Sequence, residues 1–205
     1  MSNVDEIVTN PVMTTLCDEI NKLVTGSQRS VIVAIDGNCG SGKTFYASRL
    51  ATCFDAAVIH CDHFFLPKSL RTAERIAQLG GNIHYERLRE VLATVRSNLS
   101  RSDGKCAEQL TYLAYDCSTE TFRQVTLRQT NVVIVEGSYA LHPSLREFYD
   151  LAIVFTVDKQ VQHERLLARE GEQGLANFVN KWIPLENRYF ANLDTSDCVV
   201  IDTSK

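Results

Sequence analysis

The sequence lacks the features that mark several specialised classes of protein. Its longest apolar run, residues 151–157, is interrupted by Thr156 and is far too short to cross a bilayer. The first ten residues carry no basic segment followed by an apolar core, so no secretory signal is expected. The formal net charge is −4 and there is no basic block, so neither a membrane nor a nucleic acid is an expected partner.

Cysteine is present but is not arranged in pairs. The seven cysteines include no C-x-x-C spacing, and their number is odd. This pattern argues against a disulfide framework and against a zinc site, and it favours a cytoplasmic protein in a reducing compartment. The remaining composition, 44% hydrophobic and 22% charged over 205 residues, is that of an ordinary globular protein. We therefore expect a single domain, 1–205, with a sizeable core.

One stretch matches the phosphate-binding pattern G-x-x-x-x-G-K-[ST] at every fixed position. It follows an apolar run, 31–35, that predicts a buried strand, and it precedes residues 45–54, whose spacing predicts a helix. Glycines allow consecutive backbone N–H groups to face the phosphates of a nucleotide. The stretch consists of Gly37, Asn38, Cys39, Gly40, Ser41, Gly42, Lys43 and Thr44. Lys43 adds positive charge and the Thr44 hydroxyl is a candidate Mg²⁺ ligand, so we predict a nucleotide-binding loop.

Further apolar runs predict a parallel α/β sheet, whose ligands bind at the carboxyl ends of its strands. Asp62 follows the predicted strand 57–61, and Glu136 follows the predicted strand 131–135. We expect both carboxylates to face the same crevice as Lys43. For Glu136 a role at the Mg²⁺ is favoured, because an unpaired buried acid would be destabilising. For Asp62 the alternative is a cap on the next turn.

Residues 108–128 predict an antiparallel excursion outside the main sheet. Its two strands, 111–115 and 122–127, flank a polar segment. Tyr112 and Tyr115 either line a substrate pocket or are simply half-buried, as tyrosines in strands commonly are.

A helical segment near the carboxyl end carries two arginines. Arg165 and Arg169 are four residues apart and therefore lie on one helix face. They either neutralise charge on a transferred phosphoryl group or pair with neighbouring glutamates at the surface. Gly171 and Gly174 follow and suit a hinge, so residues 159–180 are a candidate lid.

These residues together resemble the uridine kinase, phosphoribulokinase and pantothenate kinase group of P-loop kinases, and within it most closely the uridine kinase-like proteins. The resemblance extends from residue 31 to residue 202. Besides the phosphate-binding loop, it rests on Asp62-His63-Phe64-Phe65, Tyr115-Asp116, Val135-Glu136-Gly137, the pair Arg165 and Arg169, and Trp182-Ile183-Pro184-Leu185-Glu186.

The resemblance implies a P-loop NTPase fold, a three-layer αβα sandwich with a five-stranded parallel sheet of order 2-3-1-4-5, the small antiparallel excursion and a helical lid. It implies transfer of the γ-phosphoryl group of ATP to a hydroxyl of a nucleoside-like small molecule, and it leaves a homo-oligomer open. The implied site residues are Asp62 as general base with Lys43, Arg165 and Arg169 for catalysis; Thr44, Asp62 and Glu136 for Mg²⁺; and Phe65, His84, Tyr85, Tyr112 and Tyr115 for the acceptor.

Two departures from the uridine kinase pattern concern the acceptor. His84 stands near the position of an aspartate that binds ribose hydroxyls, and Cys117 replaces an aromatic residue after Tyr115-Asp116. The acceptor is therefore open among uridine, another nucleoside, nicotinamide riboside and a pantothenate-like alcohol. A non-catalytic nucleotide-binding regulator is the alternative from another class, although the D-x-x-G and N-K-x-D elements of a GTPase are missing.

Overall fold

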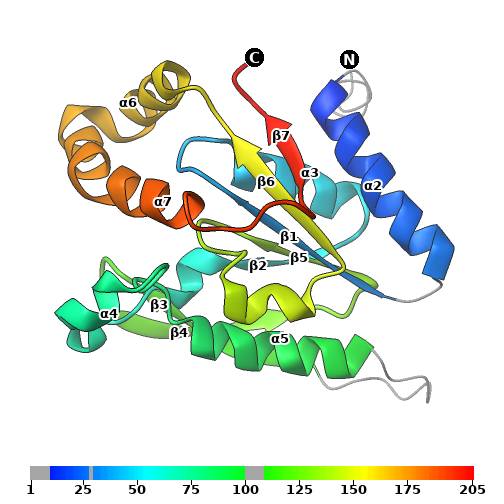
Figure 1. The fold of residues 1–205 in the computed structure, drawn as a ribbon. Helices are drawn as coiled ribbons and strands as arrows, with labels where there is room; N and C mark the ends of the chain where they lie inside the picture. Colours follow the sequence, from blue (N-terminus) through cyan, green and yellow to red (C-terminus); the bar gives the residue numbers. More distant parts are fainter. Residues whose placement is uncertain (1–9, 28–29, 100–108) are drawn as a thin grey trace.

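Five parallel strands form the central sheet, in the order β2-β5-β1-β6-β7 (Figure 1). The computed structural model describes residues 10–27, 30–99 and 109–205, so parts of the predicted domain 1–205 and the first residue of the predicted excursion 108–128 lie outside the description. The strands are β1 (Val31–Gly37), β2 (Ala57–His60), β5 (Val132–Glu136), β6 (Leu151–Thr156) and β7 (Val199–Asp202). Counted along the chain, the order is 2-3-1-4-5, which confirms the predicted arrangement.

The strand register brings the functional ends of the strands to one edge of the sheet. Ile35 of β1 and His60 of β2 are both paired with Glu136, the last residue of β5. Gly37, where the nucleotide loop begins, is paired with Phe155 of β6. Because all five strands are parallel, the segments that follow them leave the sheet on the same side.

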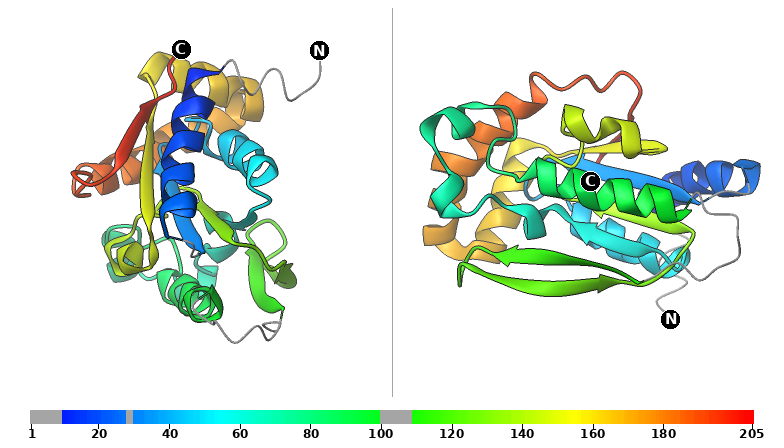
Figure 2. Two further views of the ribbon diagram at one scale, coloured as in Figure 1. Left: turned by 90° about the vertical axis from the view of Figure 1, so that its right-hand side faces the viewer. Right: turned by 90° about the horizontal axis from the view of Figure 1, so that it is seen from below.

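Helices cover both faces of the sheet, as the two views in Figure 2 show. Alternate residues of β1 point to opposite faces, so that Val33 lies in a core with α2 (Pro11–Ser27) and α3 (Lys43–Cys53). Ala34 lies in the other core, which α5 (Tyr85–Leu99) and the 3₁₀ segment η3 (Pro143–Phe148) cover. The central strands β1 and β5 are thus buried on both sides, as is typical of a parallel sheet.

The predicted antiparallel excursion is a two-stranded hairpin. β3 (Leu110–Asp116) pairs with β4 (Thr121–Leu127) in antiparallel register. Figure 2 shows this hairpin beside α5, apart from the main sheet.

Helical segments of different lengths complete the chain on the site side. The segment after β2 contains η1 (Cys61–Phe64), η2 (Lys68–Leu70) and α4 (Ala73–Ala77). The segment after β6 contains α6 (Lys159–Asn177), one π-helical turn η4 (Phe178–Trp182) and α7 (Ile183–Phe190). Within α6, Gly171 has φ 69° and ψ 179°, which breaks the helix inside the predicted lid. None of the described helices is long and apolar enough to span a membrane.

Candidate active site

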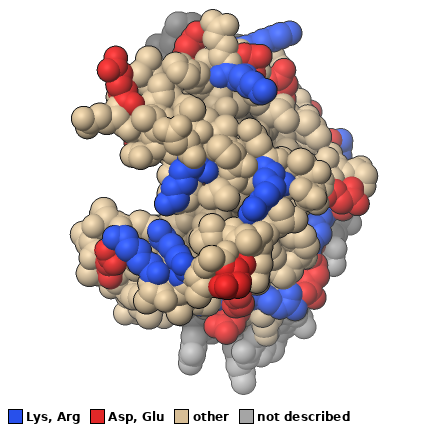
Figure 3. Space-filling view, turned by 60° about the vertical axis from the view of Figure 1, so that its left-hand side comes forward, with Lys and Arg blue, Asp and Glu red and all other residues tan. Residues whose placement is uncertain are grey.

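A cavity of about 630 Å³ lies at the carboxyl edge of the sheet, against the nucleotide loop. Figure 3 shows the molecule deeply hollowed on one side, with basic side chains around the hollow. Among the residues predicted for the site, those that line this cavity are Cys39, Gly40, Gly42, Lys43, Thr44, Phe65, Asp62, Glu136, Arg165 and Arg169. Segments that are far apart in the sequence therefore meet here, although the chemical role of each residue stays a prediction.

The nucleotide loop is held in shape by its own backbone. Gly42 has φ 86° at the N-terminus of α3, a conformation that residues with a side chain rarely adopt. A Cβ atom on Gly37 would lie 2.3 Å from the carbonyl oxygen of Phe155, so only glycine fits between β1 and β6. Lys43 Nζ donates to the carbonyl oxygens of Gly37 (2.7 Å) and Asn38 (2.9 Å). The ammonium group is thus held inside the loop, next to the place where phosphates would bind.

Glu136 is the buried hub of the predicted metal site. Its Oε2 accepts a hydrogen bond from Thr44 Oγ1 (3.0 Å), and its Oε1 accepts one from His60 Nδ1 (2.5 Å). The hydrogen bond to Glu136 raises the pKa of His60, because it stabilises the protonated ring.

Asp62 lies in η1, directly after β2, and its side chain faces the cavity. Burial raises the pKa of Asp62, and the negative charge of Glu136 raises it further. The positive charges of Lys43, His60 and Arg169 act in the opposite direction. A carboxylate with a raised pKa holds a proton more tightly, which is the property that a general base needs.

The oxygen donors at this edge fit a Mg²⁺ ion that is shared with a nucleotide. Thr44, Asp62 and Glu136 contribute one hydroxyl and two carboxylates. In the described ranges, no group of three or more His, Cys, Asp or Glu side chains is arranged to hold a metal ion by itself. Mg²⁺ binds to proteins through one or two carboxylates and takes its other ligands from water and substrate phosphates.

The two predicted lid arginines reach the cavity wall but have different partners. Arg165 donates from its guanidinium to the carbonyl oxygens of Gly40 (3.1 Å) and Thr203 (2.6 Å), and so it connects α6 to the nucleotide loop. Arg169 Nε donates to Glu170 Oε1 (2.6 Å), and its guanidinium lies 5.4 Å from the centre of the Phe178 ring. In this structure Arg169 is therefore paired with a neighbouring glutamate, which is one of the two roles that the sequence left open for the arginines.

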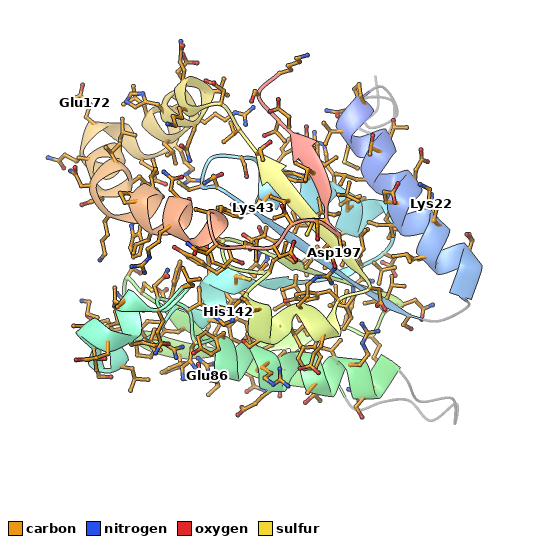
Figure 4. All side chains as sticks on the ribbon, in the orientation of Figure 1. Lys22, Lys43, Glu86, His142, Glu172 and Asp197 are labelled. Atoms are coloured by element: carbon orange, nitrogen blue, oxygen red, sulfur yellow. The ribbon has the colours of Figure 1, made fainter. Side chains whose placement is uncertain are left out.

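The structure does not bring four of the predicted acceptor residues to the cavity. Tyr85 stacks on His142, with ring centres 4.1 Å apart, and His84 Nδ1 lies 3.1 Å from the carboxylate of Glu86. Figure 4 shows His142 and Glu86 on the α5 side of the molecule, away from Lys43.

The other two are the tyrosines of the hairpin. Tyr112 is buried against Phe64, with ring centres 5.2 Å apart, and its hydroxyl is hydrogen-bonded to His63 Nδ1 (2.9 Å). Tyr115 is buried against Phe122. Both serve the packing of the hairpin, which is the alternative that the sequence left open.

A second carboxylate at the nucleotide loop was not expected from the sequence. Glu186 of α7 is buried, and its Oε2 accepts a hydrogen bond from the backbone N–H of Cys39 (2.8 Å). Its Oε1 accepts one from the hydroxyl of Ser138 (2.7 Å). From α6, Gln162 donates to the carbonyl oxygen of Cys39 (2.8 Å), so both flanks of the predicted lid are bonded to the loop.

Asp36 is a further buried acid that the prediction did not use. It accepts hydrogen bonds from the backbone N–H groups of Gly37, Tyr139 and Leu141 and from the hydroxyl of Tyr189. Burial raises the pKa of Asp36 to about 6, although these hydrogen bonds and the charge of Lys43 lower it. This residue fixes the start of the loop to the segment after β5.

Several other lining residues were not assigned to the site from the sequence. They are Arg71, Asn82, Cys117, Ser138, Tyr139, Phe178 and Trp182. The signals were weak: Asn82 stands in a Gly-Gly-Asn loop, and Trp182 is the single tryptophan of the chain.

Comparisons with known proteins agree with this geometry. No family model matches the chain. A uridine kinase of Macrococcus caseolyticus is 28% identical over 149 residues, which is 71% of this chain and 71% of that protein. The structure of a possible uridine kinase from Bacillus stearothermophilus covers 92% of this chain and is itself covered completely, with 21% identity and a TM-score of 0.59.

A second solved structure shares the fold more closely. It is a Saccharomyces cerevisiae protein described as a possible P-loop kinase with a circular permutation. It covers 94% of this chain and is itself covered over 99%, with a TM-score of 0.71 and 12% identity. The predicted resemblance to uridine kinase-like P-loop kinases and the predicted fold are therefore confirmed.

Proposed function

We propose that this chain is an ATP- and Mg²⁺-dependent kinase that transfers the γ-phosphoryl group to a hydroxyl of a small molecule. The observation that carries the proposal is the meeting, in one cavity, of the nucleotide loop with two carboxylates and two arginines. These charged residues are Lys43, Asp62, Glu136, Arg165 and Arg169. The similarity to a uridine kinase supports the same reaction class and makes uridine the first acceptor to test.

The nucleotide loop and Lys43 would bind the phosphates of ATP. The backbone N–H groups of the loop and the N-terminus of α3 favour negative charge. Lys43 Nζ would exchange its bonds to the Gly37 and Asn38 carbonyl oxygens for bonds to phosphate oxygens. Thr44, Asp62 and Glu136 would hold the Mg²⁺, which when bound neutralises charge on the phosphate oxygens.

Asp62 would be the base for the acceptor. The acceptor oxygen forms a bond to the γ-phosphorus while the bond from that phosphorus to the leaving oxygen of ADP breaks, and the hydroxyl proton passes to Asp62. Its raised pKa makes Asp62 a stronger base than an exposed aspartate. Arg165 and Arg169 would neutralise the charge on the transferred group, which requires Arg169 to leave Glu170.

The test is a screen for ADP release over uridine, other nucleosides, ribosides, pantothenate and sugar phosphates, with a control that lacks acceptor. We expect release only with a suitable acceptor and Mg²⁺. Asp62→Asn should lower kcat by about a hundredfold to ten-thousandfold while ATP still binds. Full activity in Asp62→Asn would refute the role of the base. Absence of ADP release with every acceptor, together with nucleotide-dependent binding of a partner, would favour the regulator instead.

A further inference from the structure

Two buried polar groups in the cavity wall have no hydrogen-bond partner. They are Nδ2 of Asn82 and the hydroxyl of Tyr139. Asn82 is 6% exposed and Tyr139 is 2% exposed. Within the described ranges the other buried side-chain atoms without a partner, on Ser41 and Arg87, belong to residues that do not line the cavity. An unpaired buried polar group destabilises a protein by about 1–3 kcal/mol, so these two groups indicate a ligand.

The cavity wall that contains Asn82 and Tyr139 also contains a third polar group, the guanidinium of Arg71. The backbone of Leu66 connects the segments that carry Asn82 and Arg71, because its N–H donates to the backbone carbonyl oxygen of Asn82 (2.8 Å) and its own carbonyl oxygen accepts from Arg71 Nε (2.6 Å). Burial raises the pKa of the Tyr139 hydroxyl, and the negative charges of Glu186 and Asp36 raise it further, whereas a contact with the Asn82 side chain acts in the opposite direction. The two side chains are therefore neighbours, although their contact does not reach the geometry of a hydrogen bond. All three residues line the cavity.

Arg71 is available for an anion. Its second contact is a long one, from Nη2 to the sulfur of Cys117 (3.7 Å) in the turn of the hairpin. Among the described residues no carboxylate forms an ion pair with it. Arg165 and Arg169, by contrast, are bonded to the nucleotide side and to Glu170. The positive charge of Arg71 is therefore available to a ligand in the part of the cavity that lies toward η2 and the hairpin.

The chemistry of these groups selects the ligand. The amide nitrogen of Asn82 and the guanidinium of Arg71 only donate hydrogen bonds, and the hydroxyl of Tyr139 can donate one. A ligand that satisfies all three must offer several acceptor oxygens, and the positive charge of Arg71 favours a negative charge on them. A carboxylate or a phosphate offers both several acceptor oxygens and a negative charge. A neutral sugar hydroxyl offers one acceptor oxygen and no charge.

We propose that the acceptor carries an anionic oxygen group, a carboxylate or a phosphate, in addition to the hydroxyl that is phosphorylated, and that Asn82, Tyr139 and Arg71 bind this group. The proposal rests on the proposed kinase function and names its substrate class. Arg71 is then the residue that distinguishes charged from neutral acceptors.

The experiment compares acceptors in matched pairs that differ in this one group. The pairs are pantothenol with pantothenate, nicotinamide riboside with nicotinic acid riboside, and glycerol with glycerol 3-phosphate, which keeps a free primary hydroxyl. The first two pairs test a carboxylate and the third tests a phosphate. In at least one pair we expect kcat/KM, measured by ADP release, to be about tenfold or more higher for the anionic member.

Variants test the assigned residues. Arg71→Gln should raise KM for the anionic acceptor about tenfold to a hundredfold, with little change in kcat and in the affinity for ATP. Tyr139→Phe keeps the ring and should raise KM less. Arg89→Gln is the matched control, because Arg89 pairs with Glu147 at the surface and does not line the cavity.

The two proposals fail in different ways. Turnover of neutral acceptors at least as fast as their anionic partners, unchanged in Arg71→Gln, would overturn the anionic acceptor and leave the kinase intact. Absence of ADP release with every acceptor would overturn the kinase. Calorimetric titration of pantothenate and glycerol 3-phosphate then decides the anion site: binding that Arg71→Gln weakens supports it, and no binding overturns it.

Discussion

The two halves of the cavity are built on different principles. The donor half consists of one continuous eight-residue loop and the strand ends beside it, and its geometry is set by backbone conformation and by glycine. The acceptor half is assembled from side chains of separate segments, such as Arg71, Asn82, Tyr139 and Trp182. A backbone-determined site requires particular residues at fixed spacing, whereas an assembled site requires only that suitable side chains meet.

Among the variants that compare the two halves, replacing the lysine of the donor half should have the largest effect. In Lys43→Met the loop loses its charge, and the carbonyl oxygens of Gly37 and Asn38 each lose the hydrogen bond from the ammonium group. We expect kcat/KM for ADP release to fall by about a thousandfold. Tyr139→Phe, in the acceptor half, should keep most of kcat. If kcat/KM of Lys43→Met were within a factor of ten of the wild type, the two halves of the cavity would not differ in their sensitivity to substitution.

Glu186 connects the nucleotide loop to the segment after β5, and its removal should lower stability as well as activity. Glu186→Ala leaves the N–H of Cys39 and the hydroxyl of Ser138 without their acceptor. We expect a loss of about 2 kcal/mol in the free energy of unfolding, measured by urea denaturation. Glu186→Gln keeps an acceptor oxygen and should lose less. Equal stability of the alanine variant and the wild type would show that the carboxylate does not hold the loop.

The pH dependence of turnover should report on Asp62. A protonated Asp62 cannot accept the hydroxyl proton, so kcat/KM should fall as the pH is lowered through the pKa of Asp62, which is raised above the usual value. Arg169 lowers this pKa, so Arg169→Gln should move the acid limb to higher pH. Arg169→Lys keeps the charge and should leave the limb in place. A limb at the same pH in Arg169→Gln would contradict the assignment of Asp62.

The smallest effects are expected at the aromatic residues outside the cavity. Tyr115→Phe and Tyr85→Phe should change KM for the acceptor by less than about twofold, because surface and packing positions away from a site tolerate conservative change. The measurement is the same ADP-release assay. A tenfold increase in KM in either variant would extend the acceptor half to the hairpin or to α5.

The sequence predicted the fold more completely than the site. The strands of a parallel sheet followed from apolar runs, their order was implied by the resemblance to the P-loop kinases, and the hairpin followed from its two strand-like segments. For Tyr112 the sequence could not decide, since a tyrosine in a strand has the same pattern whether it packs on Phe64 or faces a ligand. Asn82 and Tyr139 carry at most a weak local signal, because their significance arises from burial without a partner. Glu186 was likewise hidden, since its partner Cys39 is 147 residues away.

The two attachments of the lid segment to the nucleotide loop determine how that segment can move. Arg165 and Gln162 fix its beginning to Gly40 and Cys39, and Glu186 fixes its end to Cys39. A segment with one free end would swing outward as a whole. This segment is attached at both ends, so we expect it to move by bending between its attachments. The two places where its helix is irregular are Gly171 and the π-helical turn η4. Opening for product release would then be a local bend of this segment, and it would be transmitted to the nucleotide loop through the attachments at Gly40 and Cys39.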